Sequence, residues 1–318
     1  MRKIFSSLDI GSNTIKIIVG EFINNKLNIL SATKVTCRGY KNNYIINKEI
    51  LVEELKDALN KIEEDLNIKL RKVILNVPTD SLEFQLTDGR VDILDGTVTS
   101  NDIVRLLQDV SKNKIDPRNE LICTLPIIFK VDDEETYKPF GKHGNILSVK
   151  SILVSTDKKT VYDLASVIAS CNLDIIDITT TGLVDYYNFK NPELDKKNIA
   201  IVNLGYTTTN ISIFSKGIFI NNKVIEDGGF YIDKEIAAKY NLKRNETEYL
   251  KEKLALAVIN NADEKEKIKL VNKDGLEIEI NQYELTSLVS EKMDNLLKII
   301  KKNINLLTKK EISYIIIT

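Results

Sequence analysis

One short pattern occurs twice in this chain: an apolar strand ends in an acid or an amide, a glycine turn with hydroxyl groups follows, and a second strand leaves the turn. The first copy is Asp9-Ile10-Gly11-Ser12-Asn13-Thr14, and the second is Asn203-Leu204-Gly205-Tyr206-Thr207-Thr208-Thr209. A supersecondary unit that is used twice predicts two related lobes.

The order of predicted elements is the same in both halves. In the first half, strands are predicted over residues 3–10, 15–22 and 27–35, followed by a helix after an Asn47 cap and an apolar strand over residues 73–77. In the second half, strands are predicted over residues 199–204, 210–215 and 218–225, and a helical stretch around residues 233–238 follows. The sequence therefore predicts a β-β-β-α opening for each lobe.

Bulk properties agree with two lobes and exclude some partners. At 318 residues the chain exceeds the size at which one core keeps growing. Its 45 Lys and Arg residues balance 46 Asp and Glu residues, so bulk charge indicates neither nucleic acid nor an anionic bilayer as a partner. No apolar segment long enough for a signal peptide or a membrane span follows the first residues, which predicts a cytoplasmic protein.

Cysteine and histidine usage argues against two kinds of site. Cys37, Cys123 and Cys171 are odd in number and far apart, which favours small core residues over disulfides or a zinc site. His143 is the only histidine and lies in a glycine-flanked loop, where an exposed position is expected. No activated nucleophile or general base is visible, so no catalytic residue is predicted.

A different module lies between the two copies. Thr99 and Asp102 are expected to form a capping box for a helix through residues 103–110. Strands are predicted over residues 121–131 and 146–155, and a helix over residues 161–169 leads back to the first lobe. No low-complexity linker is present, so we expect packed connections between the parts.

The turn of the first copy has the composition of a phosphate-binding loop. Gly11 would let backbone N–H groups approach an anion, and Asp9 would hold the waters of a Mg²⁺ ion. By strand alternation Thr14 and Lys16 share a face, so either can reach the same anion. For one copy alone, a polar hairpin turn without a ligand is the favoured alternative.

The second copy shifts the balance toward a ligand. Gly205, Thr207 and Thr208 repeat the glycine-and-hydroxyl pattern after Asn203, so two facing turns would clamp one polyphosphate between the lobes. Two lobes that close on a ligand also form a switch.

Two further segments are candidates for contact with a nucleotide. Gly228-Gly229 precedes a helix, where it either lets the backbone approach a ligand or merely turns the chain. Glu248 and Lys251 lie at i and i+3 on a charged helix, where a solvated ion pair is the alternative to contact with a ribose or base.

These residues resemble the actin, sugar-kinase and heat-shock chaperone superfamily, whose two phosphate loops look like residues 9–14 and 203–207. Within it the chain resembles the FtsA family over nearly its whole length. The middle module carries this second resemblance through residues 98–102, Ile115-Asp116-Pro117, Leu125-Pro126, Lys130-Val131-Asp132 and Pro139-Phe140-Gly141-Lys142-His143-Gly144.

The resemblance implies an α/β, actin-like fold with duplicated ribonuclease-H-like β-β-β-α-β lobes and an inserted α+β subdomain. It places the first lobe at residues 1–81 and 161–197, the insert at 82–160, and the second lobe at 198–318 with a smaller subdomain at about 228–285. Residues 314–318 read as a core strand, after which the family continues into more sheet and a membrane-binding helix. The second lobe is therefore expected to be incomplete at its carboxyl-terminal end.

The resemblance also implies a ligand and partners. It implies ATP with Mg²⁺ between the lobes, self-association into filaments through the insert, and the carboxyl-terminal tail of FtsZ as a protein partner. By similarity Gly228, Gly229, Glu248 and Lys251 would face the nucleotide, and Lys292 would contact the FtsZ tail. Membrane attachment would need the carboxyl-terminal helix, no nucleic acid is expected, and the implied location is the inner face of the cell membrane at the division site.

Two residues of the second loop depart from the superfamily pattern. Asn203 stands where an Asp is usual, so hydrolysis is expected to suffer more than binding. Tyr206 replaces a small residue, and its ring either obstructs the approach of the backbone to the phosphates or folds outward. The expected function is a nucleotide-dependent division scaffold with at most weak ATPase activity.

Two alternatives stay open at the level of sequence. Residues 9–13 also resemble the opening of an exopolyphosphatase-like phosphohydrolase, although the second loop lacks the Asp-x-Gly-Gly-Gly-Ser pattern of that branch. An actin-like scaffold of pilus assembly, or a homologue that has lost nucleotide, is the other alternative, and Asn203 and Tyr206 favour it.

Overall fold

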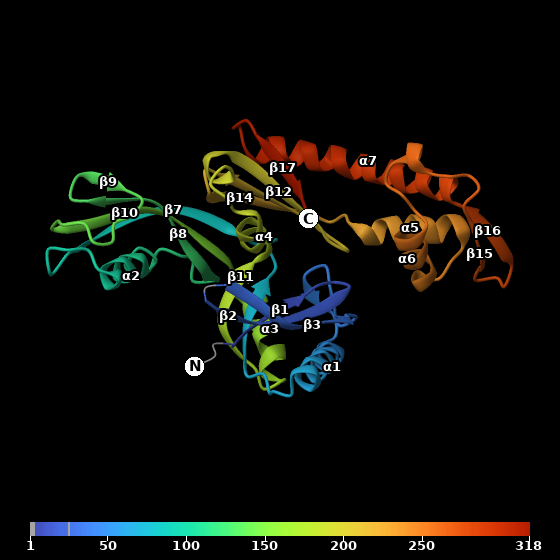
Figure 1. Cartoon of the computed structure of the whole chain (residues 1–318), viewed down its shortest axis with the longest axis horizontal. Coiled ribbons are helices and arrows are strands. Elements are labelled where there is room, and N and C mark those ends of the chain that lie inside the picture. Colours follow the sequence, from blue (N-terminus) through green and yellow to red (C-terminus); the bar gives the residue numbers. More distant parts are fainter. Residues whose placement is uncertain (1–3, 25) are drawn as a thin grey trace.

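The computed structural model describes residues 4–24 and 26–318, which form two related α/β units with smaller parts attached (Figure 1). The strands are β1 (Ile4–Ile10), β2 (Thr14–Ile23), β3 (Lys26–Thr36), β4 (Tyr40–Lys41), β5 (Tyr44–Ile45), β6 (Lys72–Val77), β7 (Glu83–Asp92), β8 (Asn119–Val131), β9 (Glu134–Thr136), β10 (Ile146–Asp157), β11 (Asp174–Thr180), β12 (Asn198–Leu204), β13 (Thr209–Ser215), β14 (Ile218–Ile225), β15 (Lys267–Val271), β16 (Glu277–Asn281) and β17 (Tyr314–Ile317). The helices are α1 (Lys48–Leu66), α2 (Ser100–Asp109), α3 (Lys158–Ala169), α4 (Thr181–Phe189), α5 (Gly229–Tyr240), α6 (Arg244–Lys253) and α7 (Gln282–Leu307), with short 3₁₀ turns at Leu194–Lys196 and Ile259–Asn261. The strand predicted over residues 3–10 begins at Lys3, which lies outside the described residues.

The two main sheets share the topology of four strands, and β11 extends the first sheet by a fifth. The first has the strand order β11-β6-β1-β2-β3, and the second has the order β14-β13-β12-β17. In the first sheet β1 is antiparallel to β2 and parallel to β6, and in the second β12 is antiparallel to β13 and parallel to β17. The duplication predicted from the repeated loop pattern is thus confirmed by strand order and direction.

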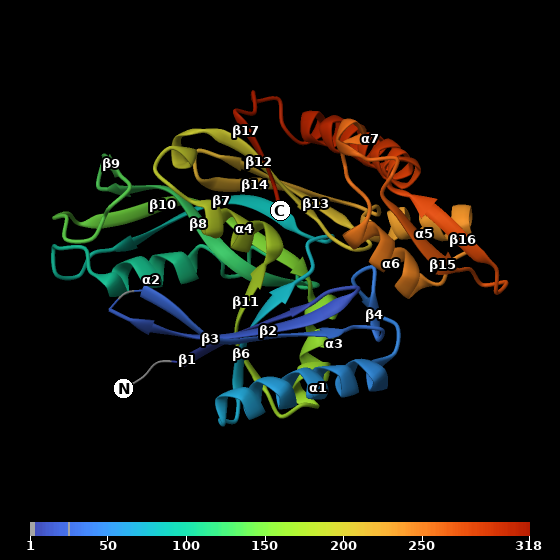
Figure 2. The ribbon, with the colours of Figure 1, turned by 45° about the vertical axis from the view of Figure 1, so that its right-hand side comes forward.

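Helix α7 covers the second sheet, whereas α5 belongs to a separate subdomain. The helix predicted around residues 233–238 is present as α5, which packs with α6, β15 and β16 in its own apolar cluster. Helix α7 lies along the second sheet, and its Leu296, Ile300 and Ile304 share a core with β12 and β13 (Figure 2). The subdomain thus separates the third strand of the second unit from the helix that covers its sheet.

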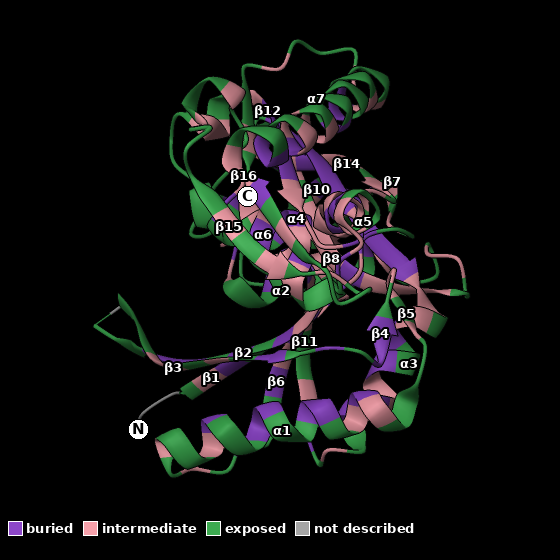
Figure 3. Ribbon diagram, turned by 90° about the vertical axis from the view of Figure 1, so that its right-hand side faces the viewer, coloured by how far each residue is buried: buried purple, intermediate pink, exposed green. Residues whose placement is uncertain are grey.

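Helix α1 covers the first sheet as predicted. The Asn47 side chain accepts a hydrogen bond from the backbone N–H of Ile50 (2.9 Å), which satisfies one free donor of the first turn. One stripe of α1 is buried and the opposite face is exposed (Figure 3), so burial of the stripe holds the helix against the sheet. The buried stripe comprises Leu51, Glu54, Leu55, Ala58, Leu59 and Ile62.

The middle module has its own sheet, with the order β7-β10-β8-β9, and one helix, α2. The predicted capping box is confirmed: the Thr99 hydroxyl accepts from the N–H of Asp102, and the Asp102 carboxylate accepts from the N–H of Thr99 (2.9 Å). His143 is exposed, as predicted, and its Nδ1 lies 2.9 Å from the Thr97 hydroxyl. The sequence did not predict β7, which pairs with β10 along its whole length.

No helix in residues 4–24 and 26–318 combines the length and apolar character that crossing a bilayer would require.

One buried carboxylate fixes the turn that leads from β3 toward α1. Glu54 on α1 is 6% exposed and accepts hydrogen bonds from the backbone N–H groups of Arg38 (2.9 Å) and Gly39 (3.1 Å) and from Nε of Arg38 (3.0 Å). A carboxylate that accepts several charge-assisted bonds in a buried position contributes more than an exposed ion pair.

We predict that Glu54→Ala lowers the free energy of unfolding by about 3 kcal/mol, because two backbone donors lose their acceptor. Urea denaturation followed by circular dichroism measures this change. The control Glu53→Ala removes an exposed carboxylate from the same helix and should change stability by less than about 0.5 kcal/mol. Equal stability of the two variants would contradict the assignment.

Candidate functional site

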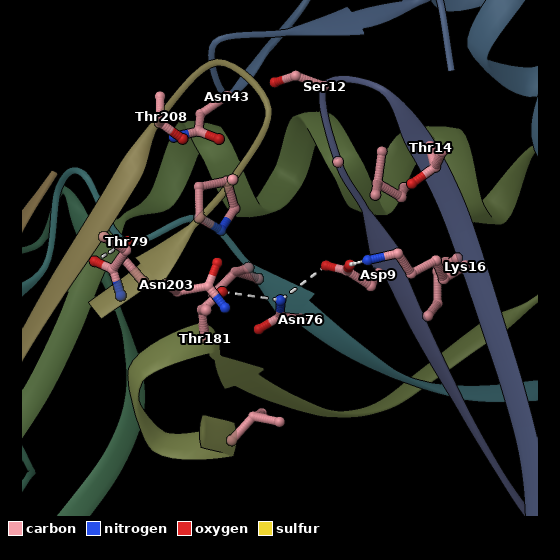
Figure 4. Close-up of a pocket in the computed structure, with 18 of the residues that line it drawn as sticks. Asp9, Ser12, Thr14, Lys16, Asn43, Asn76, Thr79, Thr181, Asn203 and Thr208 are labelled. Carbon is pink, nitrogen blue, oxygen red and sulfur yellow. Dashed lines mark hydrogen bonds and ion pairs between the residues drawn. The ribbon is translucent and has the colours of Figure 1, made fainter. Parts of the chain in front are cut away.

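A cavity of about 450 Å³ lies between the two duplicated sheets. Its lining comes from the β1–β2 turn, the end of β6, the start of α4 and the β12–β13 turn (Figure 4). This volume falls in the range of small-molecule sites. Ten of the residues predicted from sequence line it: Asp9, Gly11, Ser12, Asn13, Thr14, Lys16, Asn203, Gly205, Thr207 and Thr208.

The two glycine turns have the same backbone geometry. In the first, the N–H of Gly11 donates to the carbonyl of Thr14 (3.0 Å), and in the second the N–H of Gly205 donates to the carbonyl of Thr208 (3.0 Å). Both turns join antiparallel strands of equivalent position in their sheets. The repeated sequence pattern therefore folds into a repeated loop.

The two loops touch each other across the cavity. The Thr207 hydroxyl donates to the Ser12 hydroxyl over 2.8 Å, although the two residues are far apart in sequence. Behind this contact, the Thr79 hydroxyl donates to the Asn210 side chain (2.9 Å), and Asn222 donates to the Thr79 carbonyl (3.0 Å). These bonds join the segment after β6 to the second sheet, so the cavity is bounded by polar contacts between the lobes.

Asp9 is held at the end of β1 by a neighbour that sequence reasoning missed. Asn76 at the end of β6 donates its amide to Oδ1 of Asp9 (2.9 Å) and to the Thr181 hydroxyl (3.1 Å) (Figure 4). Lys16 lies 3.8 Å from the other Asp9 oxygen, and both side chains are about half exposed. Such an open ion pair is weak, so Lys16 is free to bind an anion in the cavity.

Asn203 stands before the second loop where Asp9 stands before the first, and Asp185 on helix α4 supplies an acid beside it. The amide of Asn203 donates to Oδ2 of Asp185 on α4 (3.1 Å) and to the hydroxyl of Thr318 (2.9 Å). Burial raises the pKa of the Asp185 carboxyl, and the hydrogen bonds from Asn203 and Thr318 oppose this rise without cancelling it. The cavity thus contains a carboxylate on each side.

Close packing of α4 places Asp185. A Cβ on Gly182 would lie 2.3 Å from the Ser212 hydroxyl and 2.8 Å from the ring of Phe219, so only glycine permits this approach to the second sheet. On the same helix, Leu183 and Tyr186 are buried against that sheet. Asp185, one turn after Thr181, is thereby brought to the cavity lining.

The glycine pair predicted to face a nucleotide supports the second loop instead. The N–H of Gly229 donates to the Gly205 carbonyl (3.1 Å), and the N–H of Phe230 donates to the Tyr206 carbonyl (2.7 Å). A Cβ on Gly228 would lie 2.5 Å from the Gly205 carbonyl oxygen, which explains the need for glycine. Among the described residues that line the 450 Å³ cavity, neither Gly228 nor Gly229 is present.

Glu248 and Lys251 also lie beside the cavity rather than in its lining. Glu248 accepts from the Asn13 amide (3.1 Å), while Lys251 pairs with the buried Asp233 (2.7 Å). Arg244 on the same helix donates to the Asn13 oxygen (2.8 Å), so Asn13 joins the first loop to α6. Glu248 thus connects α6 to the first loop, and Lys251 connects α6 to α5. Glu248 and Lys251 do not form the solvated ion pair with each other that the sequence allowed.

The Tyr206 ring folds toward α5 and α6. Its centroid lies 5.6 Å from that of Phe230, and the Arg244 guanidinium lies over it at 5.0 Å. Burial raises the pKa of the Tyr206 hydroxyl, and the Arg244 charge opposes this rise. Of the two orientations considered for Tyr206, the outward one is thus observed, although the residue still contributes to the lining.

The lining residues that the sequence analysis missed include Asn76, Thr79, Thr181, Asp185 and Asn210. One of them left a signal in the sequence, since Asn76 is a polar residue within an apolar run of β6. Thr181 and Asp185 are spaced i and i+4, which places them on one face of a helix, but α4 itself was not predicted.

The fold and the site together define the class. MreB5 of Spiroplasma citri bound to ADP matches with a TM-score of 0.54 over 96% of this chain and 80% of that chain, at 13% identity. The PilM-PilN type IV pilus biogenesis complex matches with a TM-score of 0.61 over 98% of this chain and 81% of that chain, at 11% identity. Two duplicated sheets whose glycine turns meet at one cavity, together with these matches, give this chain an actin-like fold.

Sequence comparison then identifies the family. The family model described as Cell division protein FtsA matches residues 200–313, and the SHS2 domain inserted in FTSA matches residues 80–155. The chain is 24% identical to the cell division protein FtsA of Bacillus subtilis (strain 168) over 95% of its own length and 70% of that protein. It is 22% identical to the FtsA of Staphylococcus epidermidis (strain ATCC 35984) over 92% of its own length and 64% of that protein. The chain belongs to the FtsA family of cell-division proteins.

We predict that Asn13→Ala loosens the contact between the first loop and α6, since it removes the partner of both Arg244 and Glu248. Amide hydrogen exchange in residues 244–253 should become about fivefold faster, as expected for the loss of roughly 1 kcal/mol. Asn60→Ala, an exposed change on α1, is the control and should leave this segment unaffected. Unchanged exchange in the Asn13 variant would contradict the role.

Proposed function

We propose that this protein binds ATP with its phosphates between the two glycine loops. The observation that carries the proposal is that both loops share one backbone geometry and line one cavity, with hydroxyl-bearing residues on either side. The hydrogen bond between Ser12 and Thr207 would be replaced by bonds to phosphate. The solved MreB5 structures, bound to ADP and to AMPPNP, support a nucleotide as the ligand of this fold.

The residues in the cavity fit a Mg²⁺ ion that arrives with the nucleotide. In residues 4–24 and 26–318, no three His, Cys, Asp or Glu side chains form a group that could hold a metal alone. Mg²⁺ usually keeps several waters and is held by one or two carboxylates together with phosphates. Asp9 and Asp185 supply such carboxylates, and the ion would neutralise phosphate charge.

We infer that the protein acts as a nucleotide-dependent scaffold with at most weak ATPase activity. The acids of the cavity are held by amides, at Asn76 and Asn203, and no histidine lies in the described lining. Nothing in that lining therefore resembles a nucleophile activated by a base. Closure of two lobes on a ligand gives the scaffold a state to switch.

Membership of the FtsA family supports a role at the division site. We propose that the protein binds the carboxyl-terminal tail of FtsZ, self-associates into filaments through the inserted SHS2 domain, and works at the inner face of the cell membrane. Lys292 on α7 is the proposed contact for the FtsZ tail. Its ammonium pairs with Glu235 on α5 over 2.7 Å, and both side chains are about 40% exposed. An acidic peptide would compete with Glu235 for this charge.

We expect Asp9→Ala to abolish most of the thermal protection that Mg·ATP gives. A ligand present at 100 times its Kd stabilises the folded state by about 2.7 kcal/mol, which a melting curve resolves easily. Asp88→Ala, an exposed change on β7, serves as the control and should keep the full shift in Tm. The same shift for both variants would remove Asp9 from the site.

Binding of a labelled FtsZ tail is predicted to saturate in fluorescence anisotropy, with a scrambled tail as control. Lys292→Glu should weaken it at least tenfold, through the loss of an attractive charge and the gain of a repulsive one. Glu235→Ala, which frees Lys292, should bind as well as the unaltered protein or better. If the folded protein binds neither tail, the FtsZ partnership is wrong while the nucleotide proposal stands.

A further inference from the structure

Each glycine loop carries the same chemical pair at the end of its first strand, with the two partners exchanged. In the first lobe the strand supplies the acid, Asp9, and the neighbouring β6 supplies the amide, Asn76, at 2.9 Å. In the second lobe the strand supplies the amide, Asn203, and the neighbouring α4 supplies the acid, Asp185, at 3.1 Å. Asp9 and Asn203 occupy equivalent places, each two residues before the glycine of its loop.

Packing of α4 against the second sheet fixes the position of Asp185, the acid of the second pair. Gly182 lets α4 approach the second sheet closely, and the buried neighbours Leu183 and Tyr186 fix the rotation of the helix. The NH₂ group of Asn203 donates to Oδ2 of Asp185 (3.1 Å), and this hydrogen bond orients the carboxylate. Asp9 and Asp185 both line the 450 Å³ cavity, so the two acids face the same space.

We propose that Asp185 supplies from α4 the carboxylate that β12 lacks, and that Asp185 and Asp9 together hold the water shell of the Mg²⁺ ion that accompanies the nucleotide. This inference rests on the proposed nucleotide site and assigns a specific role within it. It changes the meaning of Asn203, which becomes the residue that positions the acid rather than the sign of a lost site.

The substitution Asn203→Asp distinguishes a site that lacks its second acid from a site in which Asp185 supplies it. If an acid were simply missing, this substitution would restore it and strengthen Mg²⁺-dependent binding. With Asp185 already in place, it sets two carboxylates at the 3.1 Å separation of the present hydrogen bond. The two carboxylates repel each other, and Asp185 loses the donor that orients it, so the substitution weakens the site.

Four proteins test whether the second acid is missing or is supplied by Asp185. They are the unaltered chain, Asp185→Asn, Asn203→Asp and the double exchange Asp185→Asn with Asn203→Asp. The measurement is the affinity for a fluorescent ATP analogue in Mg²⁺ and in EDTA, and the ratio of the two affinities reports the metal without any need for hydrolysis. The matched control is Asp174→Asn, which changes an exposed residue of β11, the strand that precedes α4.

We expect Asp185→Asn to lower the Mg²⁺ ratio about tenfold, the usual effect of removing one group that orients a metal's ligands, while affinity in EDTA is kept. Asn203→Asp should lower the ratio too, the double exchange should recover most of it, and Asp174→Asn should leave it unchanged. Recovery in the double exchange also shows that loss in a single variant does not come from misfolding.

Three results would overturn the assignment. If the unaltered chain binds the analogue with a Mg²⁺ gain and Asp185→Asn retains that gain, Asp185 has no role toward the metal, although the nucleotide site stands. A larger gain in Asn203→Asp would likewise show that the second carboxylate was missing. Absence of binding by the folded, unaltered chain contradicts the nucleotide site and this inference together.

Discussion

The contact between two glycine loops is the constraint on which the rest of the structure depends. Each loop joins the first two strands of its sheet, and the Ser12–Thr207 hydrogen bond links the two turns directly. Polar contacts of Thr79 with Asn210 and of Asn13 with α6 also join the lobes, and α4 adds apolar packing against β12, β13 and β14. A ligand that enters between the loops would contact both lobes, as a switch between two lobes requires.

Much of the fold follows from local sequence patterns. Strands β1, β2, β3 and β6, the Asn47 cap of α1 and the Thr99 capping box were predicted because each depends on residues close in sequence. The covering helix α7 was not predicted, because the subdomain that contains α5 and α6 interrupts the second copy of the unit. Strand β11 and helix α4 were missed, and with them the position of Asp185.

The residues of the candidate site also divide into those that local sequence patterns predict and those that only the fold brings together. Ten lining residues belong to the two repeated loops or the strand that follows the first, where composition reveals them. Asn76, Thr181 and Asp185 come from elements that meet the loops only through sheet order and helix packing, so no local pattern predicts them. Gly228, Gly229, Glu248 and Lys251 were placed by resemblance, and the structure shows that they brace the second loop and α6. Sequence found the loops, whereas the partners that give each loop its chemistry required the fold.

The central claim is that both loops grip one ligand, and amide hydrogen exchange with and without Mg·ATP tests it most directly. Saturating nucleotide should slow exchange at least about tenfold in residues 11–14 and in residues 205–209 together, because a ligand held by both loops would suppress the opening of each. Protection of one loop alone, or of neither, would contradict the account and leave the repeated loops as polar turns that only hold the lobes together.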